Sequence, residues 1–574
     1  MRFSELTEYF ERLEATSKRL EMFDILSDLF KKADSSEIDK IIYLSQGQLL
    51  PPFHGLEIGM SEKLLIRSIS DATDISIDDV AKEFKRTGDL GKTAENLIEE
   101  KGKHLSVQDV YQRLFEIAET SGEGSVDKKI SMLGNLFSMV SSLEAKYIAR
   151  FVIGRLRLGI GDPTVLEALS LSKGSREQRP ELERAYNLCS DLGYVAKVLF
   201  DKGTAGIKKI KVRVGYPIRM ALCERLPSSE EIIAKIGKAS IEAKYDGFRC
   251  QIHKNGNNVE IFSRNLEKTT HMFPEIVEAT KTQFKAKDGM FEGEALAYNE
   301  ATGELFPFQI TIQRKRKHGI EELAKEYPLK FFAFDLLYAD GIDYTEFPYI
   351  ERRNRLSALI KKDTVIELSS AIITDDPDAV VKYFEDAVEK GLEGVVAKRL
   401  DAPYSAGARN FNWIKLKRSY KGELADTVDI CIVGYFRGKG HRAAFGVGAI
   451  LGGVYEPESD TFKTVSKVGS GFSEEEWMRL KEILDDIALT HKPARVDSLI
   501  EPDVWVEPFY VITVTADEIT RSPTHTCGRG EDGIGYALRF PRAVGFIRDD
   551  KKPEDANSVE EVIKIFNIQR RVKL

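Results

Sequence analysis

The spacing of apolar residues changes near residue 218, and that change limits how this chain can fold. Up to about residue 200, apolar side chains recur at helical intervals and strand-like alternation is scarce. Farther on, residues 247–265 alternate and turn at Asn255-Gly256, a strong hairpin signal. More strands are expected at 290–297, 330–337 and 394–398, and again from about residue 422. A helical part therefore precedes strand-rich parts, and 574 residues suffice for three or four domains.

Composition and cysteine usage exclude several classes of protein. No apolar run approaches the roughly 18 residues that span a membrane, so no membrane association is expected. The N-terminus mixes charged with apolar side chains, unlike a secretory signal. The five cysteines are odd in number and form no CxxC pair, so neither a disulfide framework nor a structural zinc site is expected. A reducing cytoplasm fits this usage.

The net charge is −8, which argues mildly against nucleic acid as a partner. The argument is weak, because DNA binding needs local basic surface and not a basic total. Basic residues do cluster at 208–213, 314–317 and 415–421. A solvated face explains any one cluster equally well, so their meaning depends on the chemistry nearby.

One predicted helix, over 144–158, carries a basic stripe. At about 100° per residue, Lys146, Arg150 and Arg157 fall within roughly 40° of one another. Apolar residues occupy the opposite side. The pattern therefore predicts a basic face backed by an apolar one.

Helix boundaries are indicated on both sides of this segment. Gly159 is expected to end the helix, and the Asp-Pro pair at 162–163 to begin the next. Upstream, a small-residue loop at 121–125 precedes Lys128 and Lys129, and the backbone N–H groups at such a helix start suit a phosphate. A plain connection between helices explains the loop equally well.

The short motif KYDGFR (244–249) places reactive side chains at the end of a strand. Strand alternation puts Glu242 and Lys244 on the same face, and Gly247 permits a tight turn or the close approach of a ligand. Arg249 follows in the hairpin strand. A motif this short occurs by chance in many proteins, so it decides nothing alone.

Further motifs follow KYDGFR along the chain. They are SRN (263–265), FEGEALA (291–297), FFAFDLLY (331–338), EGVVAK (393–398), WIKLK (413–417), LRFPR (538–542) and RDDK (548–551). In order and spacing they resemble the ATP-dependent DNA ligases of the archaeal and eukaryotic type, which belong to the covalent nucleotidyltransferases. Residues 144–161 also resemble the DNA-binding domain of that family, so the resemblance covers nearly the whole chain.

This resemblance implies a multidomain α+β fold. An all-helical DNA-binding domain is expected over residues 1–217. An antiparallel-sheet nucleotidyltransferase domain, an ATP-grasp-like ligase domain, is expected over 218–421. An OB-fold β-barrel with a C-terminal tail is expected over 422–574.

The resemblance also implies an enzyme that seals nicks between a 3′-hydroxyl and a 5′-phosphate in duplex DNA, in replication, repair and recombination. Lys244 would take AMP from ATP, the AMP would pass to the 5′-phosphate as a DNA-adenylate, and the 3′-hydroxyl would displace it. Nicked double-stranded DNA is the expected partner, bound mostly through phosphates. The chain is expected to be a monomer in the cytoplasm, associated with the nucleoid. A sliding clamp is compatible with the family, although the sequence shows no convincing clamp-binding motif.

In this chemistry, Lys244 must attack the α-phosphorus as a neutral amine. A free lysine has a pKa near 10.4, and lowering it by about three units requires roughly 4 kcal/mol. Neighbouring cations, Mg²⁺ and partial desolvation can supply that difference. A plain surface lysine is the alternative.

By resemblance, four side chains would contact the nucleotide. Glu242 would hydrogen-bond the adenine, and Phe334 would stack on its ring. Arg249 and Arg264 would contact the ribose or a phosphate.

Two carboxylates are expected to serve the ribose or a metal ion. Glu294 would hold the ribose or a metal, and Glu393 would bind a metal near the α-phosphate. Mg²⁺ is the expected ion, with Mn²⁺ as an alternative. Glu292 shares a strand face with Glu294, but the family more often has Asp there, so Glu292 receives no role. Without the motif, either carboxylate would be read as simply exposed.

The strand WIKLK is expected to supply cations for the phosphates. Alternation places Lys415 and Lys417 on one face, where they can neutralise a triphosphate and its developing charge. Lys398 and Arg409 are expected to add to this charge. A solvated edge strand would show the same alternation.

The C-terminal motif departs most from the family. Its spacing is one residue shorter, and residues 543–546 replace a more basic, bulkier run. Arg539 and Lys551 are expected to orient the pyrophosphate leaving group. Arg542 and Arg548 receive no role.

Other interpretations stay open at this point. An RNA ligase or a capping-type guanylyltransferase would share the lysine chemistry, but not the long helical N-terminal part. A NAD-dependent ligase would carry a four-cysteine zinc module, which this sequence lacks, and whether ADP or NAD can replace ATP is undecided. A non-catalytic DNA-binding scaffold is a third alternative. Gly91-Lys92-Thr93 resembles the end of a P-loop, but Arg86 stands where that loop requires glycine.

Overall fold

The computed structural model describes most of the chain. It covers residues 1–572 except 100–103, 174, 301–304, 307–310, 312–323, 325, 362–364, 391, 418–426 and 439–445. The basic cluster at 314–317, the predicted boundary at 421 and the side chain of Lys417 lie outside the described residues.

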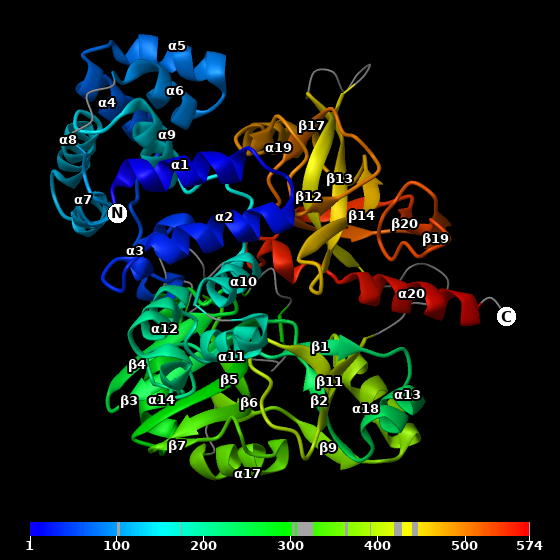
Figure 1. The fold of residues 1–574 in the computed structure, drawn as a ribbon. Helices are drawn as coiled ribbons and strands as arrows, with labels where there is room; N and C mark the ends of the chain where they lie inside the picture. Colours follow the sequence, from blue (N-terminus) through cyan, green and yellow to red (C-terminus); the bar gives the residue numbers. More distant parts are fainter. Residues whose placement is uncertain are drawn as a thin grey trace.

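The N-terminal region is helical, as the periodicity predicts (Figure 1). Its α-helices are α1 (Phe3–Glu14), α2 (Arg19–Lys32), α3 (Ile38–Ser45), α4 (Glu62–Thr73), α5 (Ile77–Thr87), α6 (Leu90–Leu97), α7 (Val107–Glu119), α8 (Ser125–Phe137), α9 (Ser142–Val152), α10 (Asp162–Lys173), α11 (Arg179–Cys189) and α12 (Leu192–Ile207). Capping boxes at Ser106 and Ser141 begin α7 and α9, because each serine hydroxyl accepts a backbone N–H of the first turn. One cluster of buried apolar side chains runs through this region.

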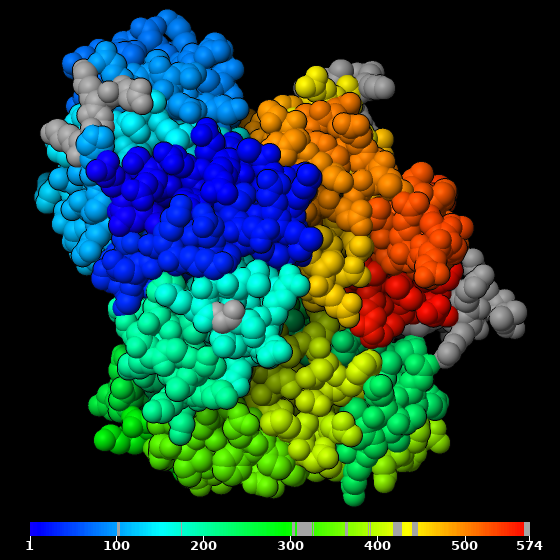
Figure 2. Space-filling model, in the orientation of Figure 1, coloured from blue at the N-terminus to red at the C-terminus, as the bar shows by residue number. Residues whose placement is uncertain are grey.

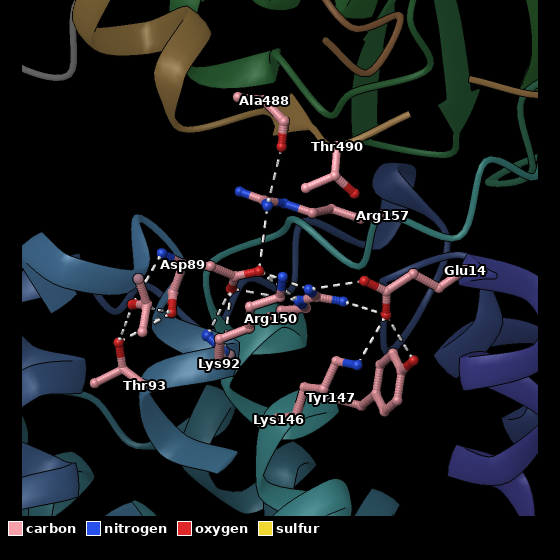
Figure 3. Close-up of polar contacts among 12 residues, drawn as sticks. Glu14, Asp89, Lys92, Thr93, Lys146, Tyr147, Arg150, Arg157, Ala488 and Thr490 are labelled. Atoms are coloured by element: carbon pink, nitrogen blue, oxygen red, sulfur yellow. Dashed lines mark hydrogen bonds and ion pairs between the residues drawn. The ribbon is translucent and has the colours of Figure 1, made fainter. Parts of the chain in front are cut away.

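The predicted basic stripe is wrong in both its helix and its exposure. Helix α9 ends at Val152, and Arg157 lies beyond it with a φ of +61°. Lys146 and Arg150 are only 6% and 1% exposed. Lys146 pairs with Glu14 at 3.0 Å, and Arg150 pairs with Glu14 at 2.8 Å and with Asp89 at 2.6 Å (Figure 3). Since α9 is enclosed by α1 and α6, carboxylates neutralise these cations in place of solvent or phosphate.

Arg157 joins the helical region to the C-terminal region. Its guanidinium pairs with Asp89 at 3.2 Å and donates to the carbonyls of Ala488 (3.2 Å) and Asp486 (2.5 Å). Figure 3 shows this side chain reaching from the helices toward Ala488. The contact holds the two regions side by side.

A second polar cluster at the same junction centres on the buried carboxylate of Asp460. Arg19 (3.0 Å) and Thr164 (3.2 Å) reach it from the helical region, and Arg495 (2.6 Å) from the C-terminal region. In Figure 2 the helical region, blue to cyan, lies against both the green middle region and the orange C-terminal region.

The middle region contains two sheets in the described residues. The five-stranded sheet has the order β1-β11-β10-β2-β9, with bounds β1 (Leu222–Arg225), β11 (Arg409–Lys417), β10 (Gly394–Arg399), β2 (Ala239–Lys244) and β9 (Ala371–Thr374). The six-stranded sheet has the order β4-β3-β5-β6-β7 with β8 beside β6. Its bounds are β3 (Phe248–Asn255), β4 (Asn258–Ser263), β5 (Asp288–Ala297), β6 (Leu329–Ala339), β7 (Ile342–Asp343) and β8 (Ile366–Leu368). The predicted hairpin and strands are therefore confirmed.

These sheets are mixed, whereas an antiparallel domain was expected. Strand β1 pairs with β11 in parallel, and β6 pairs with β8 in parallel. The connection from β6 to β8 contains helix α17 (Tyr349–Leu359), and such a crossover lets the chain return in the same direction. Helices α13 (Ser229–Ile236) and α18 (Pro377–Glu389) cover the five-stranded sheet, while α14 (Pro274–Gln283) and α17 pack on the other.

The C-terminal region is a curved sheet consistent with the expected OB fold. Within the described residues its strands follow the path β15-β17-β12-β13-β14-β16, and the two ends do not pair, so it forms half of a barrel and not a closed one. The bounds are β12 (Val428–Arg437), β13 (Val447–Glu456), β14 (Thr461–Val468), β15 (Ala488–Leu489), β16 (Val496–Asp497), β17 (Val504–Val506), β18 (Val511–Thr515) and β21 (Arg542–Ile547). A hairpin of β19 (Glu518–Ser522) and β20 (Gly535–Arg539) and helices α19 (Glu474–Asp485) and α20 (Val559–Val572) complete the region. Among the described helices, none has the length and apolar character needed to traverse a bilayer.

Replacing Arg157 with Ala should loosen the contact between the helical and C-terminal regions. The variant loses both donated hydrogen bonds to the Ala488 and Asp486 carbonyls, each worth about 1 kcal/mol. Small-angle scattering should show a larger radius of gyration than for the unchanged chain. Arg86→Ala is the control, because Arg86 pairs only on the exposed surface of α5. An unchanged radius in the Arg157 variant would contradict a closing role.

His253 ties the segment before β1 to the six-stranded sheet. Its Nδ1 accepts the backbone N–H of Gly215 at 2.9 Å, and its Nε2 lies 2.9 Å from Gln251 Oε1. Burial lowers the pKa of His253 to about 3, so the folded ring stays neutral.

The stability of the chain should therefore fall between pH 6.5 and about pH 3. Above the ordinary histidine pKa neither state binds the proton, and below it the unfolded state binds the proton while the folded state does not. Denaturant unfolding at a series of pH values should show a flatter profile for His253→Asn, whose amide oxygen can accept the Gly215 N–H. His271→Asn, at an exposed position, should leave the profile unchanged. Equal slopes for both variants would count against His253.

Candidate active site

A cavity of about 770 Å³ opens between the two sheets of the middle region and the C-terminal region. Ten of the predicted site residues line it. They are Glu242, Lys244, Arg249, Arg264, Glu294, Phe334, Glu393, Lys398, Arg409 and Lys415. Residues distant in sequence thus meet in one place.

The pairing of β2 with β10 sets Lys244 opposite the turn that carries Glu393. Lys244 lies across from Gly394, and the Glu393 N–H donates to the Lys244 carbonyl at 3.1 Å. The Lys244 Nζ forms an ion pair with the Glu393 carboxylate. The ammonium therefore sits at the end of its strand, inside the cavity.

The electrostatic surroundings of Lys244 favour its charged form. Burial acts to lower the pKa of Lys244, but Glu393, and then Glu294, outweigh it and raise the pKa above its ordinary value. Burial in turn raises the pKa of Glu294 to about 7, against the opposing effect of Lys244. The lowered lysine pKa that the chemistry requires is thus not built into these surroundings. A cation that engaged Glu393 and Glu294 would weaken their effect on Lys244.

Gly247 is required by the neighbouring strand. A Cβ at this position would lie 2.5 Å from the carbonyl oxygen of Ala295 on β5, closer than any real contact. In this structure the group that approaches Gly247 closely is the backbone of β5. This contact holds the turn after Lys244 against the sheet.

Arg249 is held by Glu292, the acidic residue to which the sequence assigned no role. Glu292 is fully buried and accepts from Arg249 at 2.9 Å, from Gln251 at 3.0 Å and from the Tyr404 hydroxyl at 2.9 Å. The Arg249 guanidinium also lies 5.4 Å from the ring centre of Phe334. Glu292 therefore fixes a cation beside the ring expected to stack on the base.

Lys398 lies apart from the pair formed by Lys415 and Arg409. Its Nζ pairs with Glu242 at 3.1 Å and donates to the Phe334 carbonyl at 3.1 Å. It also lies 4.5 Å from the ring centre of Phe334. Burial lowers the pKa of Lys398. It belongs with the side chains expected to contact the base.

Lys415 and Arg409 share one carboxylate from the C-terminal region. Both lie 2.7 Å from Glu561 Oε1 on helix α20. Burial alone would raise the pKa of Glu561, but these two cations hold it well below its ordinary value. Sequence reasoning missed Glu561. The pattern Ser558-x-x-Glu561 does signal a capping box, but it gives no hint of a partner in another region.

The alternation predicted for WIKLK is confirmed over its described side chains. Ile414 is fully buried in the core beneath the sheet, whereas Trp413 and Lys415 line the cavity. The side chain of Lys417 lies outside the described residues.

The C-terminal motif divides between the cavity and the surface. Lys551 and Arg548 line the cavity, where Lys551 pairs with Asp429 and Arg548 with Asp550 at 2.7 Å. Arg539 donates to Thr520 on the neighbouring strand at 2.6 Å, outside the cavity lining. Of the two residues expected to orient pyrophosphate, Lys551 alone lines the cavity that contains Lys244.

Comparison with known proteins identifies the family. Models of three ligase domains match in order: the DNA ligase N terminus (residues 2–170), the ATP dependent DNA ligase domain (220–417) and the ATP dependent DNA ligase C terminal region (443–551). A probable DNA ligase of Dictyoglomus turgidum is 56% identical over 575 residues, covering 100% of this chain and 99% of that protein. The DNA ligase of Sulfurisphaera tokodaii is 45% identical, with coverage of 100% and 98%.

The chain belongs to the ATP-dependent DNA ligases. It is thus an enzyme that uses ATP and seals nicks in DNA, as the ordered motifs predict. This membership removes the NAD-dependent ligase, the RNA ligase and the guanylyltransferase as alternatives. A probable DNA ligase of Aquifex aeolicus, 44% identical over the whole of both chains, agrees with the same assignment.

Replacing Glu561 with Gln in this ligase should tighten ATP binding. The amide keeps the cap of α20 but removes the charge that Lys415 and Arg409 share, so both cations become available to a triphosphate. Equilibrium titration should give an affinity about fivefold higher, or about 1 kcal/mol. Glu560→Gln is the control, since Glu560 is 60% exposed on the same helix. An unchanged or weaker affinity would count against competition at this site.

Proposed function

We propose that Lys244 is the nucleophile of this ligase. Its Nζ forms a bond to the α-phosphorus of ATP, the bond from that phosphorus to pyrophosphate breaks, and the amine loses its proton. The AMP then passes to the 5′-phosphate of a nick, and the 3′-hydroxyl displaces AMP to form the phosphodiester. The observation that carries the proposal is the place of Lys244 at the end of β2, among the other motif residues of one cavity.

The proposed nucleotide contacts follow the grouping of charges in the cavity. Glu242, Phe334 and Lys398 lie together and suit the base. Arg249 and Arg264 are proposed for the ribose or a phosphate. Lys415 and Arg409, with Lys417, are proposed for the triphosphate, because paired cations offset the charge that develops as pyrophosphate leaves.

Glu393 and Glu294 fit a divalent ion, for which we propose Mg²⁺ or Mn²⁺. Both are carboxylates beside Lys244, and hard oxygen donors are what Mg²⁺ prefers. Among the described residues no group of three candidate ligands is found, which agrees with an ion that takes its other ligands from phosphate and water. Bound there, the ion would neutralise phosphate charge. The two carboxylates would then no longer favour the charged form of Lys244, and its amine could lose its proton.

The proposed substrate is a nick in duplex DNA, acted on in replication, repair and recombination. We propose domain limits of 1–217, 218–421 and 422–574, with the outer two domains holding the duplex mostly through phosphates. A monomer in the cytoplasm, associated with the nucleoid, and contact with a sliding clamp are further proposals. Size-exclusion chromatography with and without DNA and clamp tests the assembly state.

Covalent labelling with ATP carrying a radioactive α-phosphate tests the nucleophile. The unchanged chain should acquire the label, and Lys244→Ala should acquire none. Lys268→Ala is the control, since Lys268 pairs with Glu260 on the surface. Equal labelling of the unchanged chain and the Lys244 variant would exclude Lys244. No labelling of any of the three would favour a non-catalytic scaffold.

A further inference from the structure

Glu242 is a buried carboxylate whose two oxygens are both held by donors. It is 2% exposed. The Tyr349 hydroxyl donates to its Oε1, and on its Oε2 the Ser369 hydroxyl donates at 3.0 Å and Lys398 pairs at 3.1 Å. An ionised carboxylate is an acceptor only and is costly to bury unpaired. These donors therefore hold Glu242 in one orientation.

One face of helix α17 contributes to this support directly and through Ser369. Tyr349 and Arg353 are four residues apart, so their side chains share a face. Arg353 lies 3.6 Å from Glu242 and donates to the Ser369 hydroxyl at 3.1 Å and to the Ser369 carbonyl at 2.7 Å. Arg353 thus fixes a residue that itself donates to Glu242. None of the motifs quoted from the sequence contains Tyr349 or Arg353.

The same helix is also bound to the strand that carries Phe334. Arg352 forms a bidentate ion pair with Asp335, at 2.7 and 3.0 Å, and both side chains are fully buried. Asp335 directly follows Phe334 on β6. Helix α17 is therefore fixed both to the carboxylate on β2 and to the strand that carries the ring. It sets the distance between them.

We propose that Tyr349 and Arg353 are positioning residues that make the enzyme select adenine over guanine. The inference rests on the proposed function, in which Glu242 faces the base. Adenine presents a donating amino group where guanine presents an accepting oxygen. A carboxylate whose oxygens are held in a fixed direction can accept from the first and repels the second. A carboxylate free to turn away loses that distinction.

Self-labelling with α-labelled ATP and GTP tests the proposal through Tyr349→Phe. The KM for ATP should rise about tenfold, and the preference for ATP over GTP should fall about tenfold, while the rate at saturating ATP stays within about twofold. Tyr43→Phe is the matched control. Its hydroxyl donates to buried Asp191 at 2.7 Å in the helical region, so it loses an equivalent buried bond far from the cavity. It should keep both the KM and the preference of the unchanged chain.

A second pair of variants guards against a simple loss of folding. Arg353→Ala should lower the preference for ATP over GTP. Arg353→Lys should lower it less, since lysine keeps the positive charge but lacks the several N–H donors of the guanidinium. Unaltered KM and preference in both Tyr349→Phe and Arg353→Ala would overturn the inference. Failure of the unchanged chain to label with ATP would instead refute the proposed function, so the two failures are distinguishable.

Discussion

The antiparallel pairing of β2 with β10 is the constraint on which the site depends. It sets Lys244 opposite Gly394, Glu242 opposite Val396, and Lys398 opposite Ser240. Because side chains alternate along a strand, a shift of either strand by one residue would turn its own cavity-facing side chains away from the cavity. The core beneath the sheet, which includes Ile241 and Val395, resists such a shift. Apolar packing on one face therefore holds the charged chemistry on the other.

Inside the cavity, several cations are already matched to carboxylates of the chain. Lys244 pairs with Glu393, Arg249 with Glu292, and Lys415 with Glu561. Burying these charges unpaired would cost several kcal/mol each, so pairing is a condition of folding as well as of function. Under the proposed function, a nucleotide and a metal ion would exchange with some of these partners. Those from the C-terminal region, such as Glu561, would link that exchange to the way the regions close on one another.

The need to pair buried charges also explains why the predicted basic stripe is wrong. Lys146 and Arg150 share a helix face, as their spacing predicts, but that face is covered by α1 and α6. Periodicity reports which side chains lie together and not what lies over them. Glu14 on α1 and Asp89, the N-cap of α6, turn an expected basic face into a buried ionic network. Whether this helix face is exposed or buried depends on contacts between segments that are distant in the sequence.

The sequence by itself determined the order of the motifs and the strands that carry them, because strand alternation and turn chemistry act within a few residues. Resemblance to the ligase family then named Lys244, Glu294 and Lys415 for the site, and all three line the cavity. Only the tertiary structure decided their partners. The contact between Lys415 and Glu561 and the contact between Tyr349 and Glu242 each join segments more than a hundred residues apart. Such pairings depend on how sheets and helices pack, which no local pattern encodes.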